Sequence, residues 1–119
     1  MAKRSIPRPG RAVRGSRSGR PVMAALDLLG RRWALRALWE LAREPRGFRA
    51  LQADCGDVSS SVLRERLLEL VAARLAQQDE DGRYSLTLLG AELGAALAPL
   101  DGWAKRWARA LSPRSDTEK

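Results

Sequence analysis

Three consecutive serines followed by an arginine form the clearest group of side chains equipped to bind a ligand. Ser59, Ser60 and Ser61 stand at the start of a predicted helix, and Arg64 follows one turn later. Hydroxyl and guanidinium groups donate hydrogen bonds to phosphate oxygens and to base edges. This arrangement predicts a helix that enters the major groove of duplex DNA, with Arg64 as the leading base reader.

Four more arginines are candidates for contacts with nucleic acid. Arg46 and Arg49 lie near the start of the preceding predicted helix, and Arg66 lies to the side of the serine-led helix. These three are expected to approach backbone phosphates. Arg83 lies beside three acids in a predicted hairpin, from which it would reach the neighbouring minor groove or the backbone. The alternative for each arginine is a solvated helix face with ion pairs at i, i+4 spacing.

The residue types disfavour an enzyme. The chain has no histidine and a single cysteine, so the usual general base and a cysteine zinc site are both missing. Its carboxylates are spread among arginines, and it has no glycine-rich phosphate loop. We therefore predict a binding protein that has no cofactor and no metal site.

The spacing of apolar residues predicts the elements that position these side chains. Helices are predicted over residues 21–29, 31–43, 48–54, 60–73 and 88–97, and from Pro99 onward. Leu63, Leu67 and Leu70 share the inner face of the fourth helix. A hairpin is predicted from residues 75–78 and 83–86 around an acidic turn with a glycine. The order predicts a mostly α, α+β winged helix-turn-helix fold with a short β-hairpin wing.

Charge divides the chain into an arm and a body. Residues 1–20 hold seven of the 22 basic residues and no acid, so residues 21–119 carry 15 basic against 14 acidic residues. This charge predicts that residues 1–20 form a basic N-terminal arm that is disordered when free. Such an arm would neutralise DNA phosphates or enter a groove of the duplex. The alternative is a dispensable, solvated tail. Residues 21–112 are predicted to form one domain, and residues 113–119 a frayed tail.

Hydropathy predicts where the protein is found. No apolar run approaches the roughly 20 residues of a membrane span, and the N-terminus has no apolar signal-peptide core. A single cysteine also suits a reducing compartment. We expect a cytoplasmic, nucleoid-associated protein that makes no membrane contact.

The four tryptophans fall into two pairs with different predicted positions. Trp33 and Trp39 are expected in the core behind the helix-turn-helix. Trp103 and Trp107 lie four residues apart on one face of the last helix, with Leu100 nearby, and form either the edge of the core or a dimer surface. A pocket for an unknown small-molecule effector between these aromatics and the first helix is a further hypothesis, although no convergent polar group defines it.

Four segments follow one another over most of residues 21–107: PVMAALDLLGRRWALRALWEL (21–41), FRALQ (48–52), VSSSVLRERLLEL (58–70) and YSLTLLG (84–90). In order and spacing they resemble the HxlR-type family of bacterial winged helix-turn-helix transcription regulators, relatives of the MarR-type proteins. The resemblance implies a homodimer that binds an inverted repeat, usually represses, and is held together by its first and last helices. The interface residues are then Val22, Met23, Leu26, Leu100, Trp103 and Trp107.

One position departs from that family. Many members carry a sensing cysteine just before the proline that corresponds to Pro21, where this chain has Arg20. Cys55 lies instead in the predicted turn beside Asp54 and Asp57, whose negative charge disfavours a thiolate. A redox-sensing role for Cys55 is weighed against that of an ordinary buried thiol. The wing is also shorter than in many relatives, which affects its DNA contacts.

Two other functions remain open at this point. A winged helix that uses its terminal tryptophans to bind a protein need not touch DNA, and an arginine-rich arm also suits RNA. The prediction is nevertheless a regulator that recognises a specific site on double-stranded DNA and acts as a homodimeric repressor.

Overall fold

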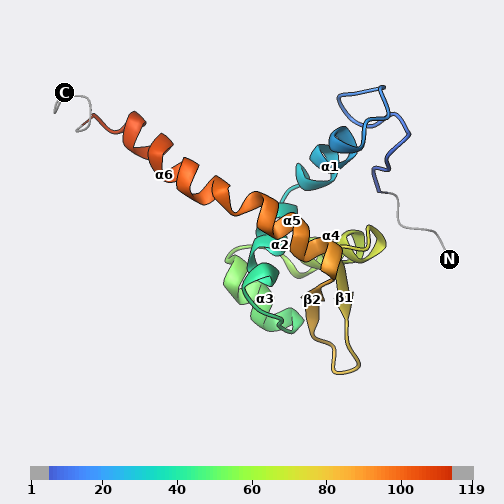
Figure 1. The fold of residues 1–119 in the computed structure, drawn as a ribbon. Helices are drawn as coiled ribbons and strands as arrows, with labels where there is room; N and C mark the ends of the chain where they lie inside the picture. The colour runs from blue at the N-terminus through green and yellow to red at the C-terminus, as the bar shows by residue number, and fades with distance from the viewer. Residues whose placement is uncertain (1–5, 114–119) are drawn as a thin grey trace.

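The computed structural model describes residues 6–113. The predicted arm residues Lys3 and Arg4 and nearly all of the predicted C-terminal tail lie outside the described residues. Within the described range the elements are α1 (Pro21–Leu29), α2 (Ala34–Arg43), α3 (Phe48–Cys55), α4 (Ser60–Ala72), β1 (Ala76–Gln78), β2 (Tyr84–Leu86), α5 (Leu88–Leu97) and α6 (Pro99–Leu111). The predicted winged helix fold is confirmed, with α2, α3 and α4 gathered around one end of the wing (Figure 1).

The core lies between α2, α3, α4 and the start of the wing. Its largest fully buried side chains are leucines: Leu38, Leu51, Leu63, Leu67 and Leu70. Three of them form the inner face predicted for α4, and each stabilises the fold by roughly 1.5–3 kcal/mol. Burial of this face fixes which side of α4 points outward.

Helix α2 begins later than predicted. Trp33 has φ 72, in the left-handed region, so the α-helix begins at Ala34 rather than at Arg31. The expectation that both early tryptophans lie in the core is wrong for Trp39, which is 37% exposed. Trp33 is partly buried and packs against the core.

The wing is a short antiparallel hairpin, as predicted. Ala76 pairs with Leu86 and Gln78 with Tyr84. In the turn, Asp79 Oδ1 accepts hydrogen bonds from the backbone N–H groups of Asp81 and Arg83, each at 2.9 Å. Such an aspartate turn closes the hairpin with its own side chain.

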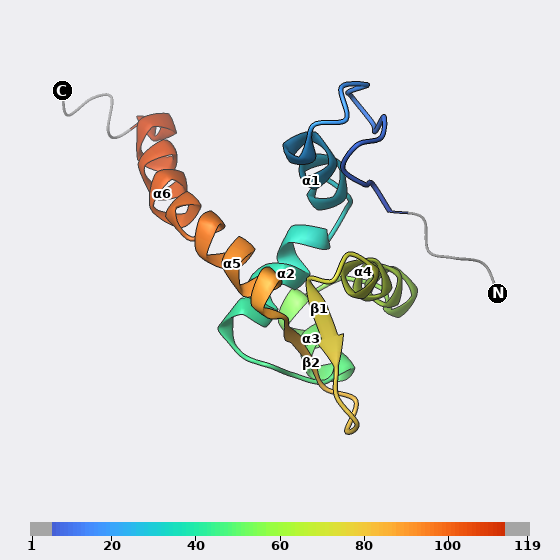
Figure 2. The ribbon, with the colours of Figure 1, turned by 45° about the vertical axis from the view of Figure 1, so that its right-hand side comes forward.

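The last helix projects from the body, whereas α5 packs against it. Ala98 ends α5 and begins α6 with helical backbone angles, so the chain continues in nearly the same direction. Figures 1 and 2 show α6 extending away from the body. No residue of α6 is buried.

Among residues 6–113, no helix is long and apolar enough to cross a membrane.

Residues 6–20 form a closed loop beside α1 (Figure 2). The Gly10 N–H donates to the Gly19 carbonyl at 2.8 Å, and Val13 and Ser16 form an antiparallel bridge. The Arg14 N–H donates to Asp27 on α1 at 3.3 Å. Gly10 and Gly19 have positive φ, which lets the loop close at little steric cost.

Candidate nucleic-acid interface

The N-terminus of α4 presents the three serines to solvent. Ser59, Ser60 and Ser61 are all exposed. Ser59 Oγ accepts a hydrogen bond from the Val62 N–H at 3.2 Å, so this hydroxyl caps the helix. The hydroxyls of Ser60 and Ser61 stand at the positive end of the helix dipole, where an anion is favoured.

Arg64 lies one turn further along the same exposed side. Its guanidinium carbon is 4.7 Å from the ring centroid of Phe48, the first residue of α3. Such a cation–π contact holds the guanidinium in place without neutralising its charge. Within residues 6–113, Arg64 forms no ion pair with a carboxylate. Sequence analysis missed Phe48, whose only signal was an aromatic ring at the start of the preceding helix.

Arg49 and Arg83 lie on the elements before and after α4 in the chain, α3 and the wing. Arg49 is exposed on α3, and Arg83 is exposed where the hairpin turn meets β2. In the described part of the chain neither side chain forms an ion pair. Both guanidiniums are therefore available to an anionic partner.

Arg46 does not belong to this surface, which corrects the expectation that it approaches phosphate. Its side chain is only 7% exposed and pairs with Asp54 and, at 3.4 Å, with Glu40. Its backbone forms an antiparallel bridge with Tyr84 of β2. Arg46 therefore ties the wing and α3 to α2, and its charge is used inside the protein.

Arg66 is a second correction of the same kind. Its side chain is 18% exposed, with Nη1 2.7 Å from Glu69 Oε1. Its Nε donates to the Arg32 carbonyl at 2.8 Å. Glu69 is also paired with Arg31 at 2.9 Å. Arg66 thus joins α4 to the loop between α1 and α2 instead of reaching out to phosphate.

Cys55 is buried at the end of α3. Only 2% of its surface is exposed. Burial raises the pKa of the Cys55 thiol, and the nearby Glu40 and Asp54 raise it further, while Arg36 opposes them. The predicted direction is confirmed, but burial contributes more than the neighbouring acids. Such a thiol is a poor nucleophile at neutral pH.

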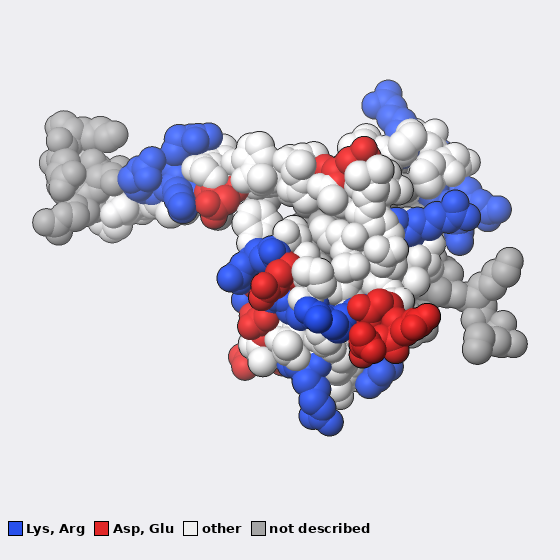
Figure 3. Space-filling model, turned by 60° about the horizontal axis from the view of Figure 1, so that its bottom comes forward, with Lys and Arg blue, Asp and Glu red and all other residues white. Residues whose placement is uncertain are grey.

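Charge on the wing side of the molecule is broken into separate groups. Figure 3 shows basic groups interrupted by acidic ones rather than one continuous basic area. Three of the acids, Asp79, Glu80 and Asp81, lie in the hairpin turn. The outer side of α4 therefore depends on a few local cations, chiefly Arg64.

Known proteins share this arrangement. The chain is 30% identical over 89 residues to YvaP of Bacillus subtilis (strain 168), described as an uncharacterized HTH-type transcriptional regulator, with 70% of this chain and 82% of YvaP covered. It is similar to the quinone-bound structure of YodB from B. subtilis, with 28% identity, a TM-score of 0.66, and 71% of this chain and 94% of that chain covered.

A possible HxlR family transcriptional factor from Thermoplasma volcanium GSS1 has the same fold, with 22% identity, a TM-score of 0.65, and 71% of this chain and 82% of that chain covered. Residues 28–112 match the family described as HxlR-like helix-turn-helix. That match spans the helix-turn-helix, the wing and the last two helices, α5 and α6. The chain therefore belongs to the HxlR-like helix-turn-helix family and is a transcriptional regulator of the HxlR and MarR type.

Proposed function

We propose that this regulator is a homodimer that binds an inverted-repeat operator and represses transcription. The observation that carries the proposal is the outer side of α4, where exposed Ser60 and Ser61 precede an Arg64 without an acidic partner among the described residues. In this role α4 lies in the major groove and Arg64 donates two hydrogen bonds to a guanine. Ser60 and Ser61 contact phosphate or base edges, and Ser59 contributes mainly as the cap.

The exposed apolar side chains of α1 and α6 support the dimer. Val22 and Leu26 are 58% and 57% exposed, and Trp103 and Trp107 are 48% and 53% exposed. The two tryptophan rings stack with their centroids 5.5 Å apart. Together with Met23 and Leu100, they form the proposed interface. A two-fold dimer presents two α4 helices about one DNA turn apart, roughly 34 Å.

The remaining cations supply contacts that do not depend on sequence. Arg49 approaches a backbone phosphate, and Arg83 reaches the flanking minor groove or backbone from the wing. The basic N-terminal arm adds long-range attraction that falls as salt rises. In this proposal the protein acts on the nucleoid, in the cytoplasm.

The signal that controls binding is proposed to be a ligand held without a covalent bond. YodB, a solved relative, is described with a bound quinone. Cys55 is the single cysteine of this chain, and it is buried with a raised pKa. We therefore assign Cys55 a packing role and look for the effector site elsewhere.

In vitro selection of bound duplex DNA tests the function. An inverted repeat is expected, and Arg64→Ala should weaken binding to it by about 1–3 kcal/mol while leaving random DNA nearly unaffected. The matched control is Arg49→Ala, which should weaken operator and random DNA alike. Equal losses on both DNAs for Arg64→Ala would remove Arg64 as a base reader. Selection that yields no motif, with tighter binding to structured RNA, would contradict operator recognition altogether.

A further inference from the structure

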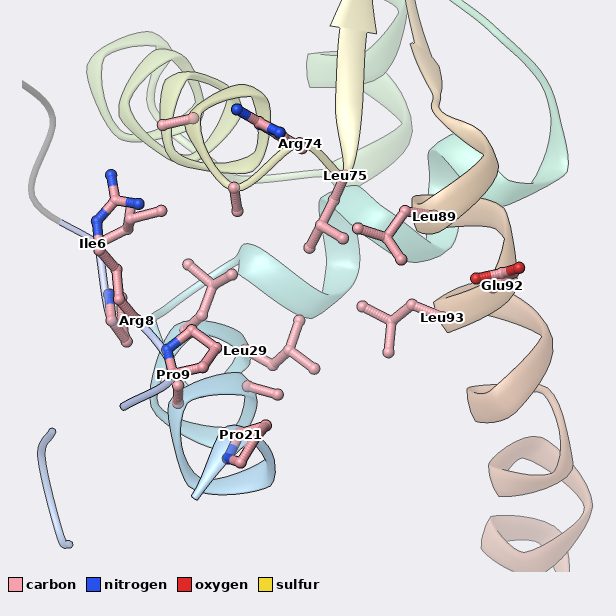
Figure 4. A pocket seen from close by; sticks show the side chains of 16 residues that line it. Ile6, Arg8, Pro9, Pro21, Leu29, Arg74, Leu75, Leu89, Glu92 and Leu93 are labelled. Atoms are coloured by element: carbon pink, nitrogen blue, oxygen red, sulfur yellow. The ribbon is translucent and has the colours of Figure 1, made fainter. Parts of the chain in front are cut away.

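A cavity of about 550 Å³ lies between α1, the end of α4, the start of α5 and the N-terminal arm. Its walls are mainly apolar, with Leu28 and Leu29 from α1 and Leu89 and Leu93 from α5 (Figure 4). Cavities of roughly 300–1,000 Å³ with such walls are the usual size of small-molecule sites. Residues 6–9 of the arm form one side of it.

Two arginines and one glutamate carry the charges that line the cavity. Figure 4 shows Arg8 on the arm side and Arg74 in the turn after α4, while the carboxylate of Glu92 lies on α5, away from both. Both arginines are exposed, and within the described residues neither side chain has an ion pair or a hydrogen bond. The cavity is therefore mainly apolar, and its two cations against one carboxylate leave it a net positive charge.

The backbone at Arg74 is held in a costly conformation. Its φ of 65 lies in the left-handed region, which costs an L-residue other than glycine about 1–2 kcal/mol. The Arg74 carbonyl accepts a hydrogen bond from Thr87 Oγ1 at 2.7 Å, which fixes this geometry. Glycine would relieve the strain at this position, yet the chain carries a long cationic side chain beside the cavity.

We propose that this cavity binds a small organic anion with an apolar body, whose carboxylate or sulfonate pairs with Arg8 and Arg74. The apolar body displaces water from the leucines, and the two guanidiniums supply charge-assisted hydrogen bonds to the anionic group. Such a ligand joins the arm to the end of α4 opposite the proposed DNA-reading residues. The claim that the bound anion controls DNA binding rests on the proposed function. The claim that the cavity binds the anion does not.

The first test is a fluorescence titration of the full chain, without DNA, with 1-anilinonaphthalene-8-sulfonate and with the uncharged N-phenyl-1-naphthylamine. We expect saturable binding of the sulfonate, weakened about tenfold by Arg8→Gln or Arg74→Gln. Binding of the uncharged probe should be unchanged. Arg17→Gln, which removes an arm charge away from the cavity, is the matched control.

Two cavity-filling variants locate the bound probe. Ala25→Trp on α1 and Ala72→Leu on α4 each place extra atoms in the cavity, and either should reduce binding of both probes. If one variant fails to fold, the other still decides. Sulfonate binding that survives the folded filling variant, or that is insensitive to both arginine substitutions, would overturn the proposed site.

A second measurement separates this inference from the proposed function. The affinity for the selected operator is measured with and without saturating sulfonate, in the parent and in the filled variant. A change in the parent alone supports an effector site. Bound sulfonate that leaves operator affinity unchanged would overturn the effector role, whereas a chain without any operator preference would overturn the proposed function and leave the anion site intact.

Discussion

The arginines of this chain have two different roles, which their surroundings separate. Arg64 and Arg49 are exposed and have no carboxylate partner within the described residues, whereas Arg46 is buried among acids. A guanidinium that is already paired inside the protein is not available to phosphate. The separation can be measured, because stability and DNA affinity should respond to different arginines.

Arg46→Ala should lower the free energy of unfolding by about 2 kcal/mol. The substitution leaves the Asp54 carboxylate without its partner, while Arg36 and Arg43 still compensate Glu40. Urea denaturation measures the loss. Arg49→Ala is the control and should stay within about 0.5 kcal/mol of the parent. If Arg46→Ala kept the stability of the parent but bound DNA more weakly, Arg46 would contact DNA after all.

The Cys55 thiol should make stability fall at alkaline pH. Its pKa is raised in the fold above the unfolded value, so the stability it contributes is complete below the unfolded pKa and is lost as pH rises through the folded pKa. Urea midpoints measured across the thiol range should show this decline, and Cys55→Ala should lack that component. Alkylation by iodoacetamide should be slower in the folded chain than in urea. Equal alkylation rates would show that the thiol is accessible.

Sequence patterns predicted the exposed side chains better than the buried polar ones. The serines and Arg64 follow from helical spacing, since Leu63 and Leu67 fix the opposite face of α4. The partners of Arg46 come from α2 and α3, and periodicity within one helix contains no information about contacts between helices. For the same reason the ring of Phe48 beneath Arg64 was not predicted.

At the scale of elements, the junction between α4, β1 and α5 sets the position of the wing. The Thr87 N–H donates to the Leu75 carbonyl at 3.1 Å, and Thr87 Oγ1 accepts from the Gly90 N–H at 3.0 Å. This second bond caps α5 at its N-terminus. The close approach of α5 to Leu75 was not predictable from the sequence, because only the assembled fold brings those backbones together.

Gly90→Ala tests that close approach. A Cβ atom at Gly90 would overlap the carbonyl oxygen of Leu75 and lie 2.9 Å from its carbonyl carbon, so backbone would have to shift. We expect a loss of about 2–3 kcal/mol in thermal or urea unfolding. The same change at Gly102, on exposed α6, meets no backbone atom and should stabilise by about 0.5–1 kcal/mol. Similar effects at both glycines would contradict the tight junction.

At the scale of the whole molecule, the core buries its apolar side chains, whereas the last helix, α6, leaves them exposed. The core uses leucines from α2, α3 and α4, whereas α6 buries nothing within its own chain. A soluble protein rarely leaves such an apolar stripe uncovered. The position of this stripe on the last helix was predictable from its spacing, but its exposure required the fold, since the same pattern would also suit the edge of a core.

The combined substitution of Trp103 and Trp107 by Glu should therefore separate the proposed dimer without unfolding the chain. Both rings are about half exposed within one chain, so the core keeps its packing, while two buried charges per subunit would be unfavourable across an interface. Sedimentation equilibrium should give the mass of one chain, circular dichroism should retain the helical signal, and operator affinity should fall because one α4 reaches only one half-site. Arg109→Glu, which adds an acid to the opposite side of α6, is the control and should remain a dimer. A double variant that keeps the mass of two chains would place the dimer contact elsewhere, with the exposed side chains of α1 as the next surface to test.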